Sequence, residues 1–264
     1  MDRIINKVKL YVKDTPKAHN TEKILKSVLL EHNFELNDND YDLIISVGGD
    51  GSFLKMIHKY NFDDTKYYAS VNAGSLGYLS SIDNEKVGEF VNDLNNNNFT
   101  IKEINLLKVK VYANDVKELY CVNEFTIRKN DFATMKANLY IDDELIEDYN
   151  GDGLVISTNT GSTGYNLVLG GPIIDKDLNA LSIIPIAPIN NKVYKALTNP
   201  MIISDKRKVT ITLRNNFNIC YLSDGIITNL NNISKIECFI DKTIKCIVPK
   251  DYNYLKTIKD KVID

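Results

Sequence analysis

The first hundred residues alternate between short apolar runs and stretches with helical periodicity. Residues 8–12 alternate apolar and polar side chains, as a strand does, and apolar residues then recur at helical spacing over 19–32. Residues 43–47 are predominantly apolar on both faces, as expected for a strand that helices cover on both sides in a parallel sheet. The alternation continues with a strand at 67–71, a loop at 72–80 and a helix at 84–94. This pattern predicts an α/β domain over residues 1–98.

Beyond the asparagine-rich tract at 92–99, the pattern changes to short strands. Runs rich in Val, Ile, Leu and Tyr follow one another closely, and turn pairs such as 114–115 and 142–143 separate some of them. Such spacing favours antiparallel hairpins. We therefore expect a mainly antiparallel β domain over residues 99–250, followed by a tail at 251–264 able to fold back on the first domain.

The composition is that of a globular protein that binds a small molecule. With 264 residues, 44% hydrophobic and 25% charged, the chain is long enough for two domains. The net charge is -3 and lysines and arginines form no block, so neither nucleic acid nor a membrane is indicated as a partner. The four cysteines lack metal-ligand spacing, and we expect reduced, buried thiols. No signal peptide or bilayer-spanning apolar run is visible, so we expect a cytoplasmic protein.

Three glycines surround a single carboxylate in the stretch GGDGS at 48–52, between an expected strand and an expected helix. Gly48, Gly49 and Gly51 can leave backbone N–H groups exposed, and the following helix N-terminus adds partial positive charge, which suits phosphate oxygens. A carboxylate is electrostatically wrong for anion binding alone, so we interpret Asp50 as a metal ligand or as a general base. The other interpretation is a glycine-rich turn in which Asp50 caps the helix.

A second acidic glycine loop lies in the β-rich half, where Asp152 sits between glycines just before a strand-like run. The polar cluster at 159–166 follows that run. Its small side chains permit a ligand to approach closely, and Tyr165 offers an aromatic face to a base. A surface loop has the same composition, so this alternative stays open.

Asn123 and Glu124 interrupt a strand-like run at 121–129. An amide and a carboxylate side by side can bind two ribose hydroxyls or an adenine amino group. A bulge or a strand end explains the same pair without any ligand. The three histidines form no catalytic pairing that we can assemble, so we assign them packing or solvated roles.

The four motifs GGDGS, VNE, GDGLVIST and GSTGYN, in this order over residues 43–190, closely resemble those of the NAD kinases. The resemblance implies an α/β N-terminal domain and a mainly antiparallel β C-terminal domain. It also implies phosphoryl transfer from ATP or polyphosphate to the 2′-hydroxyl of the adenosine ribose of NAD, giving NADP. A divalent metal, with Mg²⁺ expected, and a homodimer or homotetramer belong to the same expectation.

The resemblance also implies roles for individual residues. Asp50 corresponds to the family's catalytic base and also contacts NAD, and the first domain corresponds to the phosphate-donor domain. Asn123 and Glu124 correspond to the pair that holds the adenosine portion, and Asp152 to the carboxylate that meets the nicotinamide carboxamide. The phosphate-binding residues implied are Gly48, Gly49, Gly51 and Ser52. The further NAD-binding residues implied are Gly51, Tyr78, Thr160, Thr163, Gly164, Tyr165, Asn166, Ala187 and Ile189.

Three positions depart from the family pattern. Ser52 replaces the usual threonine and keeps the hydroxyl. Asn150 stands where many bacterial members have an arginine, which removes a charged contact to the ligand or across a subunit interface. Residues 174–176 replace a His-Pro step, which changes the expected geometry of that loop.

Two other classes of protein share part of this pattern. A lipid or sphingoid-base kinase also has a GGDG loop, but it needs a deep apolar channel, whereas the second half of this chain offers polar loops. A regulatory module that binds a dinucleotide without catalysis has no reason to keep a carboxylate at Asp50 beside phosphate. Both classes are less consistent with the sequence than an NAD kinase.

Overall fold

The computed structural model describes residues 3–74, 77–131, 133–193, 195–215 and 218–263. The chain forms two compact units: Met1–Ile104 with Thr243–Asp264 make unit 1, and Asn105–Lys242 make unit 2. The sequence led us to expect boundaries after residues 98 and 250. The units instead divide inside two long strands, β6 (Phe99–Tyr112) and β17 (Lys235–Pro249), because each of these strands continues past the end of one unit.

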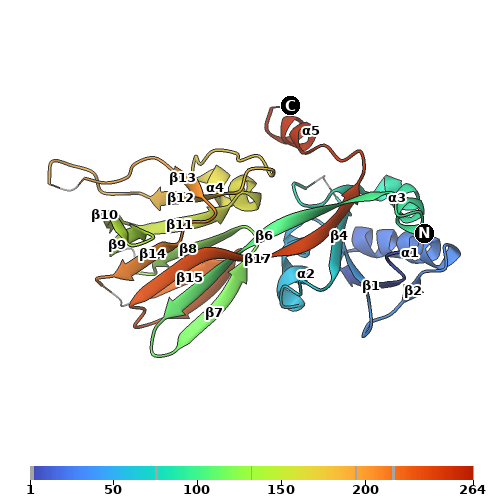
Figure 1. The fold of residues 1–264 in the computed structure, drawn as a ribbon, viewed down its shortest axis with the longest axis horizontal. Coiled ribbons are helices and arrows are strands. Elements are labelled where there is room, and N and C mark those ends of the chain that lie inside the picture. The colour runs from blue at the N-terminus through green and yellow to red at the C-terminus, as the bar shows by residue number, and fades with distance from the viewer. Residues whose placement is uncertain (1–2, 75–76, 132, 194, 216–217, 264) are drawn as a thin grey trace. The chain divides into compact units, whose positions relative to one another are not determined.

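Unit 1 is built around a parallel sheet covered by helices (Figure 1). Its strands are β1 (Lys7–Val12), β2 (Glu35–Leu36), β3 (Leu43–Gly48), β4 (Tyr67–Asn72) and β5 (Ile82–Asp83). Its helices include α1 (Pro16–Glu31), α2 (Asp50–Lys59) and α3 (Val87–Asn95). The strand order is β2-β1-β3-β4, and both β5 and residues Lys245 and Cys246 of β17 pair with β4. The predicted α/β fold of this half is confirmed.

The central strand β3 is buried along its whole length because helices cover both of its faces. Leu43, Ile45 and Val47 belong to one core cluster together with side chains of α1 and α3. Ile44 alternates to the other face of the sheet, on which α2 packs against β3. The two-sided apolar pattern of residues 43–47 therefore corresponds to two-sided burial.

The direction in which strands are added to the sheet reverses after β2. From β1 the chain passes through α1 to β2 on one side, and it then enters β3 on the other side of β1 and continues through α2 to β4. In open α/β sheets, such a switch point at the carboxyl ends of the strands is where ligands bind. Val12 lies opposite Val47 in the register, so the residues that follow β1 and β3 emerge side by side.

Unit 2 is built from antiparallel strands. A six-stranded sheet has the order β13 (Met201–Ser204), β12 (Ala180–Ile186), β11 (Gly153–Thr158), β8 (Glu124–Lys129), β15 (Ile219–Ser223) and β16 (Ile226–Leu230). The other strands of this unit are β7 (Val116–Cys121), β9 (Met135–Ile141), β10 (Glu144–Gly151) and β14 (Val209–Leu213), with parts of β6 and β17. Side chains from both sets, such as Phe125 and Leu139, share one core. The expectation of a mainly antiparallel second half is confirmed.

Short helical segments complete the description of the chain. They are η1 (Asn84–Lys86), η2 (Thr160–Thr163), α4 (Tyr165–Val168), α5 (Tyr254–Ile258) and η3 (Lys259–Ile263). All four cysteines are buried free thiols, as their spacing led us to expect. Within the described part of the chain, no helix is both long and apolar enough to cross a bilayer.

Candidate functional site

The GGDGS stretch forms the turn from β3 into α2 in unit 1. Helix α2 begins at Asp50, and Gly49 is its N-cap residue, with extended backbone and no side-chain capping bond. A Cβ at Gly48 would lie 2.3 Å from Ser52 Oγ, so only glycine fits there. The N-cap glycine therefore leaves N–H groups of the first turn available to an anion, as the sequence predicts for a phosphate loop.

The Asp50 carboxylate holds the segment that follows β4. Its Oδ2 accepts a hydrogen bond from the N–H of Tyr78 at 2.7 Å, and its Oδ1 accepts from the N–H groups of Leu79 and Ser80, both at 3.0 Å. Asp50 is therefore not the helix cap, and that alternative interpretation was wrong. The structure adds a role that the sequence did not indicate, because this carboxylate anchors a loop about thirty residues away.

Gly77 makes this anchoring possible. A Cβ at this position would lie 1.8 Å from Asp50 Oδ1, which no packing tolerates. Gly77 itself is buried, and Tyr78 is half-buried. Tyr78, an expected contact residue, thus reaches the Asp50 loop through its backbone N–H rather than through its ring.

Lys13 is a residue of this region that we did not predict. It directly follows β1, its N–H donates to Val47 O at 3.0 Å, and its Cβ would lie 3.3 Å from a Cβ at Gly48. Its side chain is exposed. Lys13 therefore stands at the switch point, next to the glycine loop. The sequence carries a signal for it, since basic residues that directly follow a strand of an α/β unit lie at the ligand edge.

Asn123 and Glu124 pack tightly against the polar cluster at 160–165 in unit 2. A Cβ at Gly161 would lie 2.1 Å from Asn123 O, and a Cβ at Gly164 would lie 2.8 Å from Glu124 Oε2. The N–H of Tyr165 donates to Glu124 Oε2 at 3.4 Å. The two motifs, about forty residues apart in sequence, thus form one polar corner. Its glycines are required for close approach.

The chemistry of this corner is unusual for a strand end. Glu124 is only 8% exposed, and burial together with the nearby charge of Asp224 raises the pKa of Glu124 to about 7, against the opposing effect of the Tyr165 N–H. Asn123 Oδ1 is buried and has no hydrogen-bond partner among the described residues. A buried amide oxygen without a partner costs free energy unless a ligand satisfies it.

The remaining residues of the cluster differ in burial and in what their side chains contact. Thr160 and Thr163 are the first and last residues of η2, which is followed by α4, and Tyr165 is half-buried. Asn166 is completely buried, and its Nδ2 donates to Ser162 O at 2.8 Å and to Pro172 O at 3.0 Å. The amide group of Asn166 therefore holds the loop together.

Asp152, Ala187 and Ile189 form a separate group. Asp152 immediately precedes β11, and its N–H donates to Ile186 O at 2.9 Å, while the N–H of Ile189 donates to Asn150 O at 2.7 Å. The polar corner lies beyond the other end of β11, about 17 Å away at the usual rise per residue. Every residue of β11 is buried, so a ligand cannot lie along it. The two groups therefore lie at opposite ends of β11.

Asn150, one of the departures from the family pattern, lies inside this group. It is 5% exposed, and its Nδ2 donates to Asp148 O at 3.2 Å. An arginine in its place would need room for a charged group that this buried position does not provide. The contact proposed for the family's arginine is therefore absent from the described residues around position 150.

No group of three or more His, Cys, Asp or Glu side chains in the described residues is arranged to hold a metal ion. Asp50 is a lone carboxylate, and its oxygens already bind three N–H groups. The side chains described here therefore do not fit a metal held by the protein alone.

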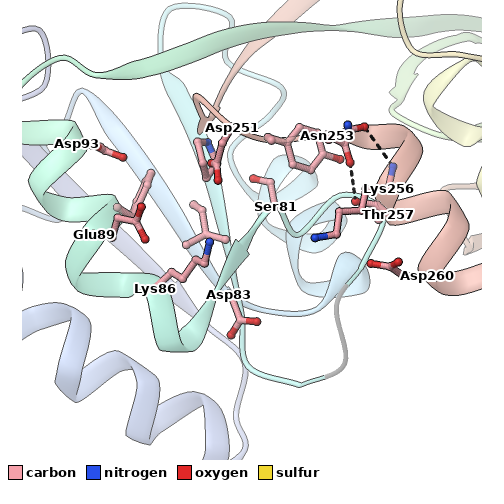
Figure 2. A pocket seen from close by; sticks show the side chains of 14 residues that line it. Ser81, Asp83, Lys86, Glu89, Asp93, Asp251, Asn253, Lys256, Thr257 and Asp260 are labelled. Carbon is pink, nitrogen blue, oxygen red and sulfur yellow. Dashed lines mark hydrogen bonds between the residues drawn. The ribbon is translucent and has the colours of Figure 1, made fainter.

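Unit 1 also contains a pocket of about 250 Å³ next to the anchored segment (Figure 2). Ser81 and Ile82, which directly follow the segment 78–80, form part of its wall, together with residues of η1, α3 and the C-terminal α5 region. Figure 2 shows Glu89 and Asp260 on opposite sides of this pocket. No motif in the sequence predicted it, because its lining comes from segments more than 150 residues apart.

Two family models match the chain, the ATP-NAD kinase N-terminal domain over residues 2–99 and the ATP-NAD kinase C-terminal domain over residues 122–238. The chain is 34% identical to an NAD kinase of Finegoldia magna, over 99% of this chain and 98% of that protein. It is 32% identical to an NAD kinase of Streptococcus pneumoniae, over 97% and 96% of the two chains.

Two solved structures have a similar fold. A yeast NADH kinase complexed with NADH has a TM-score of 0.86 at 18% identity, covering 98% of this chain and 87% of that one. An NAD kinase from Archaeoglobus fulgidus in complex with ATP has a TM-score of 0.77 at 19% identity, covering 97% and 98%. At these identities the two structures demonstrate the fold alone.

The close approach of Gly77 to Asp50 generates a first prediction. Gly77→Ala places a methyl group where Asp50 Oδ1 lies and should break the hydrogen bonds to residues 78–80, lowering the free energy of unfolding by about 2 kcal/mol. Gly74→Ala is the matched control, since the nearest atom to a Cβ there is Asn72 Oδ1 at 3.9 Å. Urea denaturation of both variants measures the difference. Equal stabilities would show that the anchoring contributes nothing.

Proposed function

The chain belongs to the NAD kinase family, and on that premise we propose that it phosphorylates the 2′-hydroxyl of the adenosine ribose of NAD to give NADP. The donor is ATP or polyphosphate, and the cytoplasm is the expected location. The observation that carries this proposal is the placement of one carboxylate, Asp50, at the uncapped start of α2, directly beside a glycine turn suited to phosphate. The same carboxylate also anchors residues 78–80, so the test must separate its catalytic role from this structural one.

The transfer itself needs few protein groups. The ribose oxygen attacks the terminal phosphorus of the donor, the new O–P bond forms as the bond to the leaving phosphate breaks, and the hydroxyl proton passes to Asp50. Catalysis of this kind depends on positioning and electrostatic stabilisation.

The acceptor is proposed to bind at the polar corner of unit 2. A ribose or an adenine group would satisfy the unpartnered Asn123 Oδ1, and Glu124 offers a second polar atom beside it. Tyr165 can stack on the base. The yeast relative carries NADH in its solved structure, which supports a dinucleotide as the ligand class of this fold.

The donor is proposed to bind at the switch point of unit 1. The first-turn N–H groups of α2 and the cation of Lys13 both favour phosphate oxygens. The Archaeoglobus relative carries ATP in its solved structure. Mg²⁺ is proposed to arrive with the donor, held mainly by phosphates and water, which is how Mg²⁺ binds where a protein offers only one or two carboxylates.

A homodimer or homotetramer is proposed because Asp152, Ala187 and Ile189 lie at the far end of β11 from the acceptor corner. A second copy of the chain can bring its own Asp152 group to the nicotinamide end of the same NAD molecule. Isologous association supplies such a composite site twice in each dimer.

The function is tested by incubating the protein with NAD, Mg²⁺ and either ATP or polyphosphate, and detecting NADP with an NADP-specific dehydrogenase. We expect NADP from the wild-type protein and a kcat at least ~10²-fold lower for Asp50→Asn, because the general base is lost. NAD affinity, measured by calorimetry, should remain. Asp50→Asn also weakens the anchoring of residues 78–80, so Gly77→Ala serves as the comparison that loosens the loop and keeps the carboxylate.

Three outcomes contradict parts of this proposal. Asp50→Asn with more than about a tenth of the wild-type kcat excludes the general base. If Asp50→Asn and Gly77→Ala lower kcat equally, the loss results from loosening residues 78–80 and not from removing a base. No NADP from either donor, together with a melting shift by a sphingoid base and none by NAD, favours a lipid kinase.

Lys13 provides a prediction for the donor site. Lys13→Met should raise the KM for ATP about tenfold, equivalent to ~1.4 kcal/mol, and leave NAD affinity unchanged, because one charge-assisted contact to phosphate is lost. Lys13→Arg should restore most of the affinity. Lys23→Met, on the exposed middle of α1, is the control for a change in net charge. An unchanged KM in Lys13→Met removes this residue from the donor site.

The composite acceptor site provides a further prediction. Glu124→Gln and Asp152→Asn should each weaken NAD binding by about 1–3 kcal/mol in separate preparations. Refolding the two variants together should restore about a quarter of the sites. About half of the dimers are then mixed, and one of the two sites in a mixed dimer combines an intact Glu124 with an intact Asp152. Calorimetric titration counts these sites. A monomer by light scattering, or no recovery on mixing, contradicts the composite site.

A further inference from the structure

The turn between β15 and β16 carries an aspartate that reaches the acceptor corner. Asp224 has a positive φ of 47° and is followed by Gly225 with a φ of 81°, so the turn is tight and left-handed. The N–H of Asp224 donates to Glu124 O at 3.1 Å. Ser223 pairs with Phe125 across β15 and β8, which fixes the turn beside the start of β8.

The Asp224 carboxylate accepts hydrogen bonds from three successive backbone N–H groups. Its Oδ2 accepts from Val122 at 2.8 Å, and its Oδ1 accepts from Asn123 at 2.7 Å and from Glu124 at 3.2 Å. These residues connect β7 to β8, where the chain leaves one strand pairing and enters another. Without the carboxylate, these N–H groups would lose their partner in a largely buried place.

We propose that Asp224 is a positioning residue of the acceptor site, whose carboxylate sets the directions in which Asn123 and Glu124 meet the adenosine ribose. The proposal rests on the function proposed above and adds a residue that none of the sequence motifs contains. Asp224 acts through the backbone of its neighbours, since its oxygens are directed to their N–H groups.

The Asp224 charge, together with burial, also raises the pKa of Glu124. Two groups act on the Glu124 carboxylate: the Asp224 carboxylate from the β15–β16 turn and the Tyr165 N–H from the segment after η2. Burial and the Asp224 charge both favour the protonated form of Glu124, so near neutral pH a fraction of the molecules carries a carboxylic acid there. A carboxylic acid donates one hydrogen bond and accepts another, which matches a ribose hydroxyl.

The sign of the pH dependence follows from the raised pKa of Glu124. A carboxyl whose folded pKa lies above its unfolded value stabilises the fold most at low pH, and this contribution is lost as the pH rises from about 4.5 towards 7. Removing the Asp224 charge should lower the pKa of Glu124 and reduce this loss. A loosened turn would also expose Glu124 and lower its pKa, so a variant that keeps the charge at position 224 is needed to separate the two effects.

The test uses Asp224→Asn, which keeps the shape of the side chain and removes its charge, with Asp115→Asn in the exposed β6–β7 turn as the control. Carbon NMR of labelled glutamate carboxyls in the ligand-free protein, with Glu124→Gln to assign the signal, follows the titration of Glu124. We expect a midpoint near pH 7 in the wild-type protein and in Asp115→Asn, and a clearly lower midpoint in Asp224→Asn. NAD affinity at pH 7 should fall about tenfold only in Asp224→Asn.

Asp224→Glu separates position from charge, because it keeps the negative charge and changes its reach. We expect weaker NAD binding with the Glu124 midpoint still near pH 7. If Asp224→Asn does not fold, wild-type NAD affinity in Asp224→Glu overturns the proposal. If Asp224→Asn folds, an unchanged titration midpoint of Glu124 or an unchanged NAD affinity in this variant overturns the proposal. A wild-type protein that fails to bind NAD would refute the proposed function instead, and the titration without ligand would still decide whether Asp224 controls Glu124.

Discussion

Backbone N–H groups in irregular segments are held by carboxylates in both units, and the geometry of each candidate site depends on this interaction. Asp50 binds the N–H groups of residues 78–80, and Asp224 binds those of residues 122–124. A buried N–H without a partner costs about 1–3 kcal/mol, and hydrogen bonds to a charged acceptor are stronger than neutral ones. Each carboxylate therefore orders three residues at once, and glycines such as Gly77 and Gly164 give the chain room to approach.

Much of the fold follows from local patterns. The apolar run at 43–47 and its neighbour at 67–71 predicted two strands that are indeed buried in a parallel sheet, because burial on both faces leaves a continuous apolar run that is visible in the sequence. The sequence led us to expect a helix after Ser52, whereas α2 begins at Asp50. Its N-cap is Gly49, which has no capping side chain and so no signature. The two units divide inside β6 and β17, whose strand pattern continues across both divisions and gives no local signal of them.

The site was predictable only where its residues are close in sequence. GGDGS, Asn123 with Glu124 and the cluster at 159–166 stand out because polar residues and glycines interrupt apolar runs. The link from Asp50 to residues 78–80 and the link from Asp224 to residues 122–124 join segments 28 to 102 residues apart. Aspartate and glycine are common in turns, so the SDG sequence at 223–225 does not distinguish Asp224 from an aspartate that only forms a turn. The separation of Asp152 from Glu124 likewise depends on the buried course of β11.

The division of unit 1 into two segments of the chain has a consequence for how the protein is made on the ribosome. Lys245 and Cys246 of β17 pair with Tyr67 and Tyr68 of β4, so β4 lacks these partners until the last part of the chain has been translated. All of unit 2 is translated before then, because it lies between residues 104 and 243. Domains usually complete their folding in order from the N-terminus during synthesis. Here unit 1 is completed by a segment that is translated after the whole of unit 2, so the two units cannot complete their folding in the order in which their first residues are made.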